Sequence, residues 1–508
     1  MKNLDVFMIF LTVRLVSVYF VQTFYVPDEY WQTLEVAHNL VYEYGYLTWE
    51  WSKGIRSYIP PLVVSGLYKF LNLLGLDSAE LLGMVPIFSD IHTKIYAPRV
   101  LQAFLSSYSD LCFYKWSGTK KWAVFAMASS WFWFYTGSRT LINTLECSLT
   151  TIALSKFPWP GKGIEESSTF IWITALLFTI RPTSAIVWLP LCLYHLKITK
   201  ESFLNITFTK YFPIGFIILS LSTLIDSLCH GSLLIPPYGF LKFNLLENLS
   251  SFYGEQPWHW YLSSGLPGIL GIQVLPFLLA TVVVLKNRKV HPNELVMLGT
   301  IVFAVAVYSH LRFSYLPHKE FRFLLPLLPL VFYISSRFLS AWSRKANKFS
   351  IWLVAVVIFI GNLGPAWYLG MVHQRGTLDV MTPLREVSKQ NLPDTSLLFL
   401  MPCHSTPLYS HLHVNVTARF LTCLPNFSNI ENYVDEADAF YKSPIDWLRQ
   451  NYPPNGTLPS HIISYDVLVP SISNILSRYK LTHEIFHTNI PISSRIGRYV
   501  VIHKLIDF

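Results

Sequence analysis

"LDVFMIFLTVRLVSVYFVQTF" (residues 4–24) leads directly into "YVPDEYWQ" (residues 25–32), and together they predict a membrane helix that ends at two adjacent acids. About twenty mostly apolar residues are enough to cross a bilayer. The segment is longer and more aromatic than the apolar region of a signal peptide, and no cleavage site of small residues follows it. We therefore expect a retained first transmembrane helix, with Asp28 and Glu29 just beyond its end.

The composition of the whole chain is that of a polytopic α-helical membrane protein. Only 14% of the 508 residues are charged, against about 25% in soluble proteins, and the mean hydropathy is +0.38. Apolar spans recur through residues 1–370 and predict about eleven to thirteen transmembrane helices. Basic connectors at 115–121, 286–289 and 343–348 are expected in the cytosol by the positive-inside rule. We attribute the net charge of +9 to Lys and Arg in such loops, where they contact anionic lipid, and we expect no nucleic-acid partner.

The character of the chain changes after residue 370. Residues 371–508 contain no apolar span of membrane length, and instead alternate short β-like runs with helical stretches. The β-like runs are "SLLFLMP" (396–402), "HIISYDVLV" (461–469) and "RYVVIHKL" (498–505), and "DAFYKSPIDWLRQ" (438–450) is helical in pattern. This predicts a small α/β domain over 371–508, after a membrane module over 1–370.

Glycosylation sequons and cysteines bear on the side of the membrane that this domain occupies. The sequons are Asn205, Asn248, Asn415, Asn426 and Asn455. Three of them fall in the C-terminal domain and favour a luminal location, whereas Asn205 lies in a lysine-rich connector and is expected to be cytosolic and bare. Cys403 and Cys423 are in the same domain, either as a luminal disulfide or as two buried thiols.

The loop over residues 25–57 is then luminal and carries the two acids. Its middle has apolar residues at helical spacing and predicts a helix lying on the membrane surface: Trp31, Leu34, Val36, Leu40, Val41 and Tyr44. Acids at a helix start are favoured by the helix dipole, by about 0.3–1 kcal/mol. Two acids beside lipid, flanked by aromatic residues, also fit a catalytic base. Spacing alone supports both interpretations of Asp28 and Glu29.

A second polar cluster lies in "YLPHKEFRFLLPLLPL" (315–330), where His318, Lys319, Glu320 and Arg322 precede an apolar helix. Cations at a helix start oppose the dipole, so three potential cations there suggest a bound anion such as a phosphate. The alternative is an interfacial anchor with long side chains that reach the headgroups.

A third segment, "ENLSSFYGEQPWHWYLSSGLPG" (247–268), is rich in aromatic residues and turns. Its aromatic cluster suits sugar rings or lipid headgroups, and an ordinary interfacial belt is the simpler alternative. The cluster consists of Trp258, His259, Trp260 and Tyr261.

Several charges lie within or at the ends of the apolar spans, where they are costly and usually face a cavity or a partner. These are Arg14, Arg99, Arg139, Arg181 and Asp110. We expect Asp110 to pair with one of the arginines. Arg181 and Pro182 predict a helix break beside a cavity.

These motifs resemble the lipid-linked mannosyltransferases of glycosyltransferase family 22. The resemblance is carried by "PDEYWQTLEVAHNLVYEYGYLTWEW", "FYGEQPWHWYLSSGLP" and "PHKEFRFLLPLLPL", and it covers nearly the whole chain except an insertion at 83–95. It implies the GT-C fold and a multi-pass protein of the endoplasmic reticulum membrane with its active site facing the lumen. "FLMPCHSTPLYSHLHVN" (399–415) and "RFLTCLPN" (419–426) indicate the branch that acts on GPI-anchor precursors.

The resemblance implies transfer of the third mannose, in α-1,2 linkage, from dolichyl-phosphate mannose to the GPI-anchor precursor. His318, Lys319 and Arg322 then hold the donor phosphate, and Asp28, or Glu29 in second place, is the base. A β-linked donor and an α-product mean inversion. The chain has no Asp-x-Asp pair of the kind that holds a metal on a nucleotide sugar, so no metal or other cofactor is expected.

Other functions fit part of the same pattern. Another family member would transfer α-1,2 or α-1,6 mannose to N-glycan precursors, or the fourth mannose to GPI. A lipid transporter or flippase would have inverted repeats, which the sequence does not display. A non-catalytic subunit of a membrane complex would tolerate loss of Asp28.

Overall fold

The computed structural model of the chain describes residues 2–75, 90–163, 167–246, 254, 256–310, 319–392, 394–428, 430–453 and 456–506. His318, Asn248, Asn455 and most of the insertion at 83–95 lie outside these residues. The chain divides into two compact units. The membrane unit comprises Met1–Tyr19, Glu50–Val63 and Ala97–Ala366, and the sheet unit comprises Phe20–Trp49, Val64–Tyr96 and Trp367–Phe508. The sheet unit thus includes residues 20–49, well upstream of the predicted domain start at 371.

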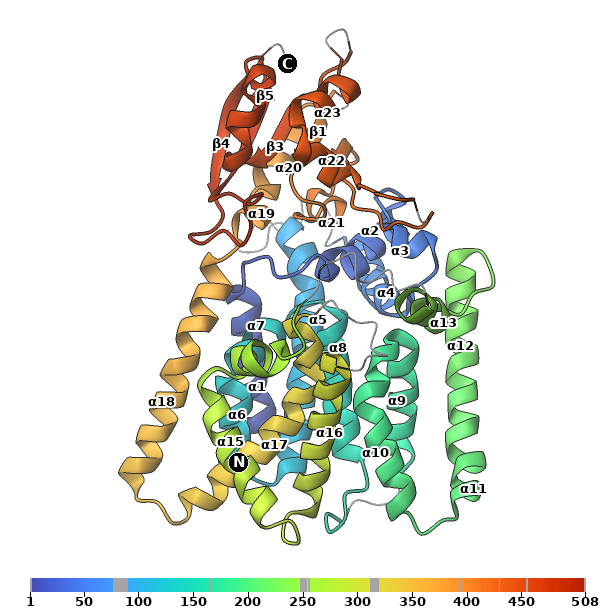
Figure 1. Ribbon diagram of the computed structural model, residues 1–508, viewed down its shortest axis with the longest axis vertical. Helices are drawn as coiled ribbons and strands as arrows, with labels where there is room; N and C mark the ends of the chain where they lie inside the picture. The colour runs from blue at the N-terminus through green and yellow to red at the C-terminus, as the bar shows by residue number, and fades with distance from the viewer. Residues whose placement is uncertain are drawn as a thin grey trace. The chain divides into compact units, whose positions relative to one another are not determined.

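The membrane unit is built from helices (Figure 1). They include α1 (Asn3–Phe20), α5 (Asp90–Ser117), α6 (Lys121–Ser129), α7 (Trp131–Thr136), α8 (Ile142–Lys156), α9 (Thr169–Ile180), α10 (Ala185–Ile198), α11 (Phe203–Ile206), α12 (Phe212–His230), α13 (Pro236–Leu241), α14 (Leu266–Leu270), α15 (Val274–Lys286), α16 (Pro292–His310), α17 (Leu328–Ser343) and α18 (Lys348–Trp367). Six helical stretches among the described residues are long and apolar enough to cross a membrane. The chain is therefore a multi-pass membrane protein, and the larger predicted number of crossings stays a prediction.

Arg14 and Asp110 form a buried ion pair that confirms the predicted partnership. Arg14 on α1 donates from Nε and Nη2 to Asp110 Oδ2 on α5, at 2.9 and 2.8 Å. The indole of Trp133 donates to the other carboxylate oxygen at 2.8 Å. Both charged side chains are fully buried. Hydrogen bonds thus reach both carboxylate oxygens, and the buried pair connects α1 with α5.

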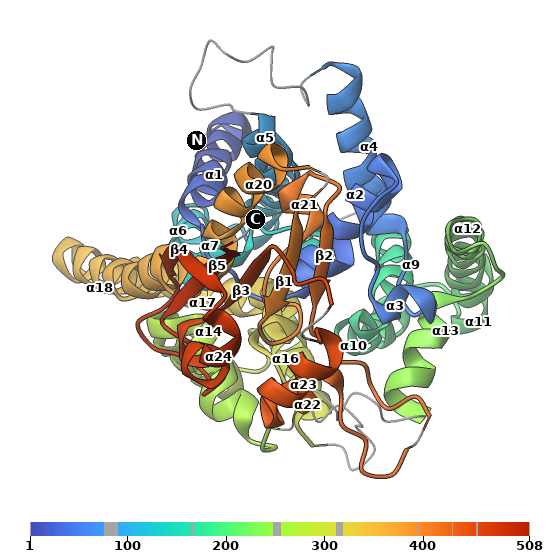
Figure 2. The same ribbon diagram turned by 90° about the horizontal axis from the view of Figure 1, so that it is seen from above.

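The predicted helix break at Arg181 is also confirmed. Helix α9 ends at Ile180, Arg181 has extended backbone angles (φ −146°, ψ 96°), and a single 3-10 turn (Pro182–Ser184) leads into α10. Proline cannot donate the hydrogen bond that would continue the helix. Thr179 and Ser184 border an apolar cavity of about 410 Å³ between α9, α10 and α12, which lie beside one another in Figures 1 and 2.

The sheet unit contains a mixed sheet in the order β2-β1-β3-β5-β4 within the described residues. Its strands are β1 (Ser396–Leu400), β2 (Thr417–Phe420), β3 (His461–Tyr465), β4 (Tyr479–Phe486) and β5 (Tyr499–Leu505). Strands β2, β1 and β3 are parallel, and β5 and β4 add in antiparallel fashion. The three predicted β-like runs are β1, β3 and β5, and the helical pattern forms α22 (Glu436–Lys442) and α23 (Pro444–Asn451). The edge strands were not predicted, because the exposed β4 lacks an apolar run.

Both faces of the sheet are covered, as expected for a core of parallel strands. Leu398 and Leu400 of β1 point to one face, where Phe440 and Leu448 of α22 and α23 pack. The other face packs against α20 (Met381–Gln390) and against the acidic loop at the start of the chain. Figure 2 shows the strands of the sheet side by side from above.

The acidic loop forms the helices η1 (Tyr30–Leu34) and α2 (Glu35–Tyr42), as its spacing predicts. The expectation that this helix lies on the membrane surface is wrong for Trp31, Leu34 and Val36. All three side chains are at most 4% exposed. Trp31 and Leu34 belong to the hydrophobic core of the sheet unit. The spacing of apolar residues on a helix face is the same whether lipid or protein covers that face, so the sequence does not distinguish the two.

Candidate active site

Asp28 and Glu29 occupy the first turn of the helical segment that follows Pro27. The Pro27 carbonyl accepts hydrogen bonds from the amides of Tyr30 and Trp31, at 2.9 and 3.0 Å, which fixes the turn. Asp28 is half-buried and Glu29 is fully buried. Among the described residues, the Glu29 side chain makes no capping hydrogen bond to η1. The segment continues as a π-helix, a rare conformation that occurs often at functional sites.

His404 is the electrostatic neighbour of Asp28 in the sheet unit. Burial lowers the pKa of His404 to about 4, while the charge of Asp28 acts in the opposite direction. The imidazole packs 4.8 Å from the Trp31 ring, and the Trp31 indole donates to the Thr406 carbonyl at 3.1 Å. The imidazole is therefore neutral at physiological pH. We did not predict a role for His404, although it lies in the "PCHSTP" stretch that marks the family branch.

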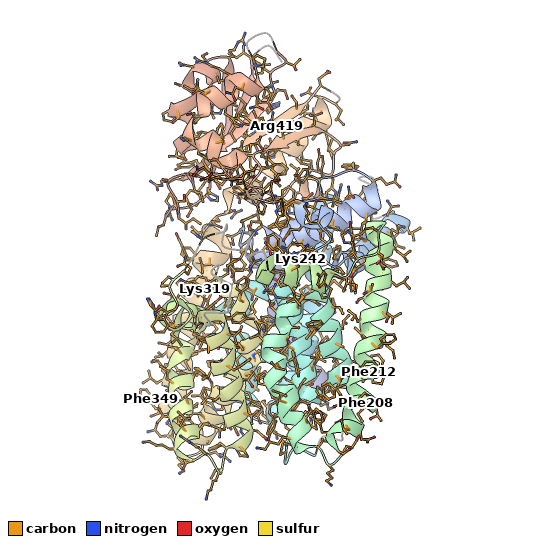
Figure 3. The ribbon with its side chains drawn as sticks, turned by 45° about the vertical axis from the view of Figure 1, so that its right-hand side comes forward. Phe208, Phe212, Lys242, Lys319, Phe349 and Arg419 are labelled. Atoms are coloured by element: carbon orange, nitrogen blue, oxygen red, sulfur yellow. A yellow bond between two sulfur atoms is a disulfide. The ribbon has the colours of Figure 1, made fainter. Side chains whose placement is uncertain are left out.

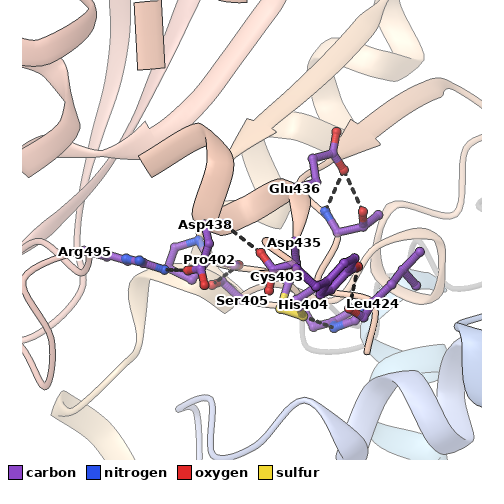
Figure 4. The surroundings of a disulfide bond; sticks show 12 residues. Pro402, Cys403, His404, Ser405, Leu424, Asp435, Glu436, Asp438 and Arg495 are labelled. Atoms are coloured by element: carbon purple, nitrogen blue, oxygen red, sulfur yellow. Dashed lines mark hydrogen bonds and ion pairs between the residues drawn. A yellow bond between two sulfur atoms is a disulfide. The ribbon is translucent and has the colours of Figure 1, made fainter. Parts of the chain in front are cut away.

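A disulfide fixes the backbone around His404, as Figure 4 shows. Cys403 and Cys423 are bonded, with their Cα atoms 5.9 Å apart, which confirms the disulfide over two buried thiols. His404 itself adopts a left-handed backbone (φ +57°), which is uncommon for a residue with a side chain. Cys423 follows strand β2, so the bridge ties the His404 loop to the sheet.

Glu35 attaches the acidic loop to the C-terminal sequence. Its Oε1 accepts hydrogen bonds from the Leu408 amide at 2.7 Å, the Ser410 amide at 3.1 Å and the Ser410 hydroxyl at 2.5 Å. The side chain is fully buried. Burial raises the pKa of the Glu35 carboxyl, and the hydrogen bonds from Ser410 and Leu408 lower it in part. Sequence analysis did not predict this contact, because Glu35 and Ser410 are 375 residues apart.

The predicted cation cluster of the membrane unit surrounds the start of η8 (Phe321–Leu327), with Lys319 and Glu320 just before this helix and Arg322 in its first turn. Lys319 and Arg322 are 8% and 7% exposed, so both charges are withdrawn from solvent. Lys319 Nζ donates to the Gln256 carbonyl at 2.7 Å, and Arg322 Nη2 donates to Glu320 Oε1 at 2.5 Å. Figure 3 labels Lys319, and His318 lies outside the described residues. Both side chains are more deeply buried than those of a surface anchor, whose charged ends reach water.

Two of the four predicted aromatic residues pack against this cluster. Trp260 lies 4.8 Å from the ring of Phe321, and the buried Tyr261 hydrogen-bonds to the backbone of Glu320. Phe321 also packs closely against Gly268, where a Cβ would lie only 2.9 Å from the Phe321 ring. Trp258 and His259 are exposed, and their rings meet edge to face with centroids 5.6 Å apart. The structure therefore joins two motifs that are about sixty residues apart, and leaves half of the aromatic cluster open to solvent or lipid.

A buried polar network connects Arg181 to the backbone of Arg322 through residues that were not predicted, Glu146 and Asn143. Glu146 on α8 faces Arg181 Nε at 2.9 Å, and Arg181 Nη1 donates to Asn143 Oδ1 at 3.4 Å. Asn143 Nδ2 in turn donates to the backbone carbonyl of Arg322 at 3.3 Å. Glu146 lies within the apolar span 139–155, where burying an acidic side chain costs free energy. Its position in that span could therefore have identified it from the sequence.

The chemical capacity of these groups is that of acid–base and anion chemistry. The sheet unit supplies a half-buried carboxylate, Asp28, held beside a neutral imidazole. The membrane unit supplies two buried cations, Lys319 and Arg322, on a segment framed by aromatic rings. A carboxylate of this kind can accept a proton, and guanidinium and ammonium groups bind phosphate oxygens.

Comparison with known proteins identifies relatives along the whole chain. The Alg9-like mannosyltransferase family profile matches residues 5–413. The chain is 48% identical to "GPI mannosyltransferase 3" of Drosophila melanogaster, over 96% of this chain and 85% of that protein. It is 42% identical to "GPI alpha-1,2-mannosyltransferase 3" of Danio rerio, over 99% of this chain and 90% of that protein.

A solved structure shares the fold. ArnT from Cupriavidus metallidurans, in the crystal structure bound to undecaprenyl phosphate, superposes with a TM-score of 0.55 at 10% identity. The match covers 98% of this chain and 97% of that chain. The fold is therefore the GT-C fold that the sequence predicts.

Proposed function

Because this chain belongs to the Alg9-like mannosyltransferase family, we propose that it transfers the third mannose, in α-1,2 linkage, to the GPI-anchor precursor. The observation that carries the proposal is the full-length similarity to proteins named GPI mannosyltransferase 3 and GPI alpha-1,2-mannosyltransferase 3. The cysteine pair and His404 lie in the stretch that separates this branch from the N-glycan enzymes.

The proposed donor is dolichyl-phosphate mannose. Its phosphate carries one negative charge at the membrane surface, and Lys319 and Arg322 provide buried cations on the membrane unit. Glu320 holds the Arg322 guanidinium, which leaves the planar fork in a fixed orientation for phosphate oxygens. The binding of undecaprenyl phosphate by ArnT, a GT-C neighbour, supports a polyprenyl phosphate ligand.

The proposed base is Asp28, which takes the proton from the acceptor hydroxyl as the sugar is transferred. The hydroxyl oxygen bonds to the anomeric carbon, and the bond from that carbon to the phosphate oxygen breaks with its electron pair on the phosphate. A single displacement inverts the β-linkage of the donor to an α-linkage. Phosphate is a good leaving group, so one carboxylate suffices, and we propose that neither a metal nor another cofactor takes part.

The proposed location is the endoplasmic reticulum membrane, with Asp28 and the sheet unit in the lumen. A disulfide in the sheet unit supports an oxidising compartment. Asn415 is an exposed sequon of that unit and Asn426 a half-buried one, whereas Asn205 lies in the membrane unit. Endoglycosidase treatment of single Asn→Gln variants should show a glycan on the sheet unit. A glycan on Asn205 alone would reverse the topology.

Complementation is the decisive test of the function. Cells that accumulate GPI precursors with two mannoses should regain GPI-anchored proteins at their surface when this chain is expressed. The purified chain should then transfer mannose from dolichyl-phosphate mannose in the presence of EDTA. Rescue of cells deficient in N-glycan mannosylation instead would assign the chain to another branch, and strict dependence on a divalent ion would contradict the metal-free mechanism.

A further inference from the structure

Arg181 shares an aromatic neighbour with Arg322, although it lies more than a hundred residues away, in the break between α9 and α10. The guanidinium carbons of Arg181 and Arg322 lie 5.4 and 5.5 Å from the centre of the Phe323 ring. Asn143 hydrogen-bonds to both, through the Arg181 side chain and the Arg322 backbone. Arg181 is therefore part of the same local structure as the cation cluster.

The partners of Arg181 differ from those of the other buried arginine pair. Arg14 makes four hydrogen bonds, and its partner Asp110 accepts on both oxygens. Arg181 makes one long hydrogen bond, and its Nε faces Glu146 at ion-pair distance without hydrogen-bond geometry. A guanidinium has five N–H donors, so the described residues leave several of those on Arg181 for another acceptor.

Arg181 is 11% exposed and follows the last residue of α9, where the carbonyl end of the helix favours a cation. Glu146 faces Arg181 and Glu320 faces Arg322 at ion-pair distance. A phosphate at these guanidinium groups would accept charge-assisted hydrogen bonds from the Arg181 donors that the described residues leave open.

We propose that Arg181 is a second arginine of the donor-phosphate site, and that Glu146 is a positioning residue that directs its guanidinium. This inference rests on the proposed function. It adds to the donor-phosphate site a contact between Arg181 and the leaving phosphate. When the bond to the anomeric carbon breaks, the phosphodiester of the donor becomes a phosphomonoester, which carries more negative charge near neutral pH. A second guanidinium therefore stabilises the leaving phosphate more than the intact donor.

The test measures equilibrium binding of dolichyl phosphate and of uncharged dolichol to the purified full-length chain in lipid nanodiscs. The wild-type chain should prefer dolichyl phosphate. Arg181→Gln should reduce this preference roughly tenfold to hundredfold, the usual range for a lost hydrogen bond to a charged group. Arg181→Lys should restore part of it, because the charge is kept and the fork is lost.

Variants of the partner residue separate binding from folding. Arg181→Gln alone leaves Glu146 buried without its counter-ion, so its abundance is expected to fall. The double variant Arg181→Gln, Glu146→Gln removes both charges and should recover abundance while the preference for dolichyl phosphate stays low. The matched control is Arg14→Gln with Asp110→Asn, which should lower abundance and leave the preference of the folded fraction unchanged.

Two results overturn the proposal in different ways. A folded double variant that prefers dolichyl phosphate as strongly as the wild type would show that the Glu146–Arg181 pair only stabilises the fold. A wild-type chain that binds dolichol and dolichyl phosphate equally would refute the donor itself, and with it the proposed function of the cation cluster.

Discussion

The carboxylate region of the sheet unit and the cation cluster of the membrane unit are held in place in opposite ways. Trp31 and Glu35, which follow the acidic turn, bond to residues 375 positions away in sequence. Arg322 bonds to Glu320, two positions away, on a segment that the sequence marks as one motif. The comparison teaches that the Arg322 guanidinium is oriented from within its own motif, whereas the acidic turn depends on a distant scaffold. Each of the following predictions disturbs one side of this comparison.

The largest effect should follow from Asp28→Asn. Loss of a general base lowers the rate by about 10²–10⁴-fold, and the amide is of similar size to the half-buried carboxylate. Mannose transfer by the purified enzyme measures the effect, and abundance should stay near the wild-type level. Glu43→Gln, an exposed acid of the same loop, is the control and should be fully active. Full activity of Asp28→Asn would move the base elsewhere, with Glu29 the next residue to test.

The scaffold of the acidic region should fail when Glu35 is truncated. Glu35→Ala leaves the amides of Leu408 and Ser410 and the Ser410 hydroxyl buried without an acceptor, at a cost of about 3 kcal/mol or more. We expect this variant to accumulate poorly and to expose residues 404–412 to proteolysis. Glu35→Gln keeps an acceptor oxygen and avoids burying a charge, so it should accumulate far better than Glu35→Ala. Equal behaviour of the two variants would mean that these hydrogen bonds do not hold the loop.

The cation cluster should respond to geometry as well as to charge. Arg322→Lys keeps the positive charge but removes the planar fork that Glu320 orients, so donor binding should weaken by about tenfold. The KM for dolichyl-phosphate mannose, measured with the acceptor in excess, reports the change. Arg344→Lys, in a connector of the membrane unit, is the matched control. An Arg322→Lys enzyme with the wild-type KM would show that only the charge matters there.

The smallest effect concerns pH and His404. Burial lowers the pKa of His404 from 6.5 to about 4, so between these values the unfolded chain binds a proton that the folded chain does not. The stability that comes from this group is complete above pH 6.5 and is lost as the pH falls from 6.5 toward 4. His404→Gln should therefore lose less thermal stability on acidification than the wild type. His483→Gln changes an exposed histidine of the same unit, and it should keep the wild-type pH dependence.

The sequence was sufficient for features that are local in the chain. Apolar length predicted the membrane helices, Pro182 predicted the break after Ile180, and apolar runs predicted β1, β3 and β5. The contiguous charges of residues 319–322 were found for the same reason. Each of these signals lies within one helix, strand or turn, where backbone geometry and hydrophobic spacing act directly.

Tertiary structure alone decided which surface covers a side chain and which distant residues meet. The spacing of Trp31 and Leu34 predicted a helix, but only the folded sheet unit shows that protein rather than lipid buries them. Glu146 lies on α8 and Arg181 in the break between α9 and α10, and the shared ring of Phe323 comes from a third segment. A sequence records the chemistry of each side chain, while the contacts that set its burial and charge balance form only when chain packing brings separate segments together.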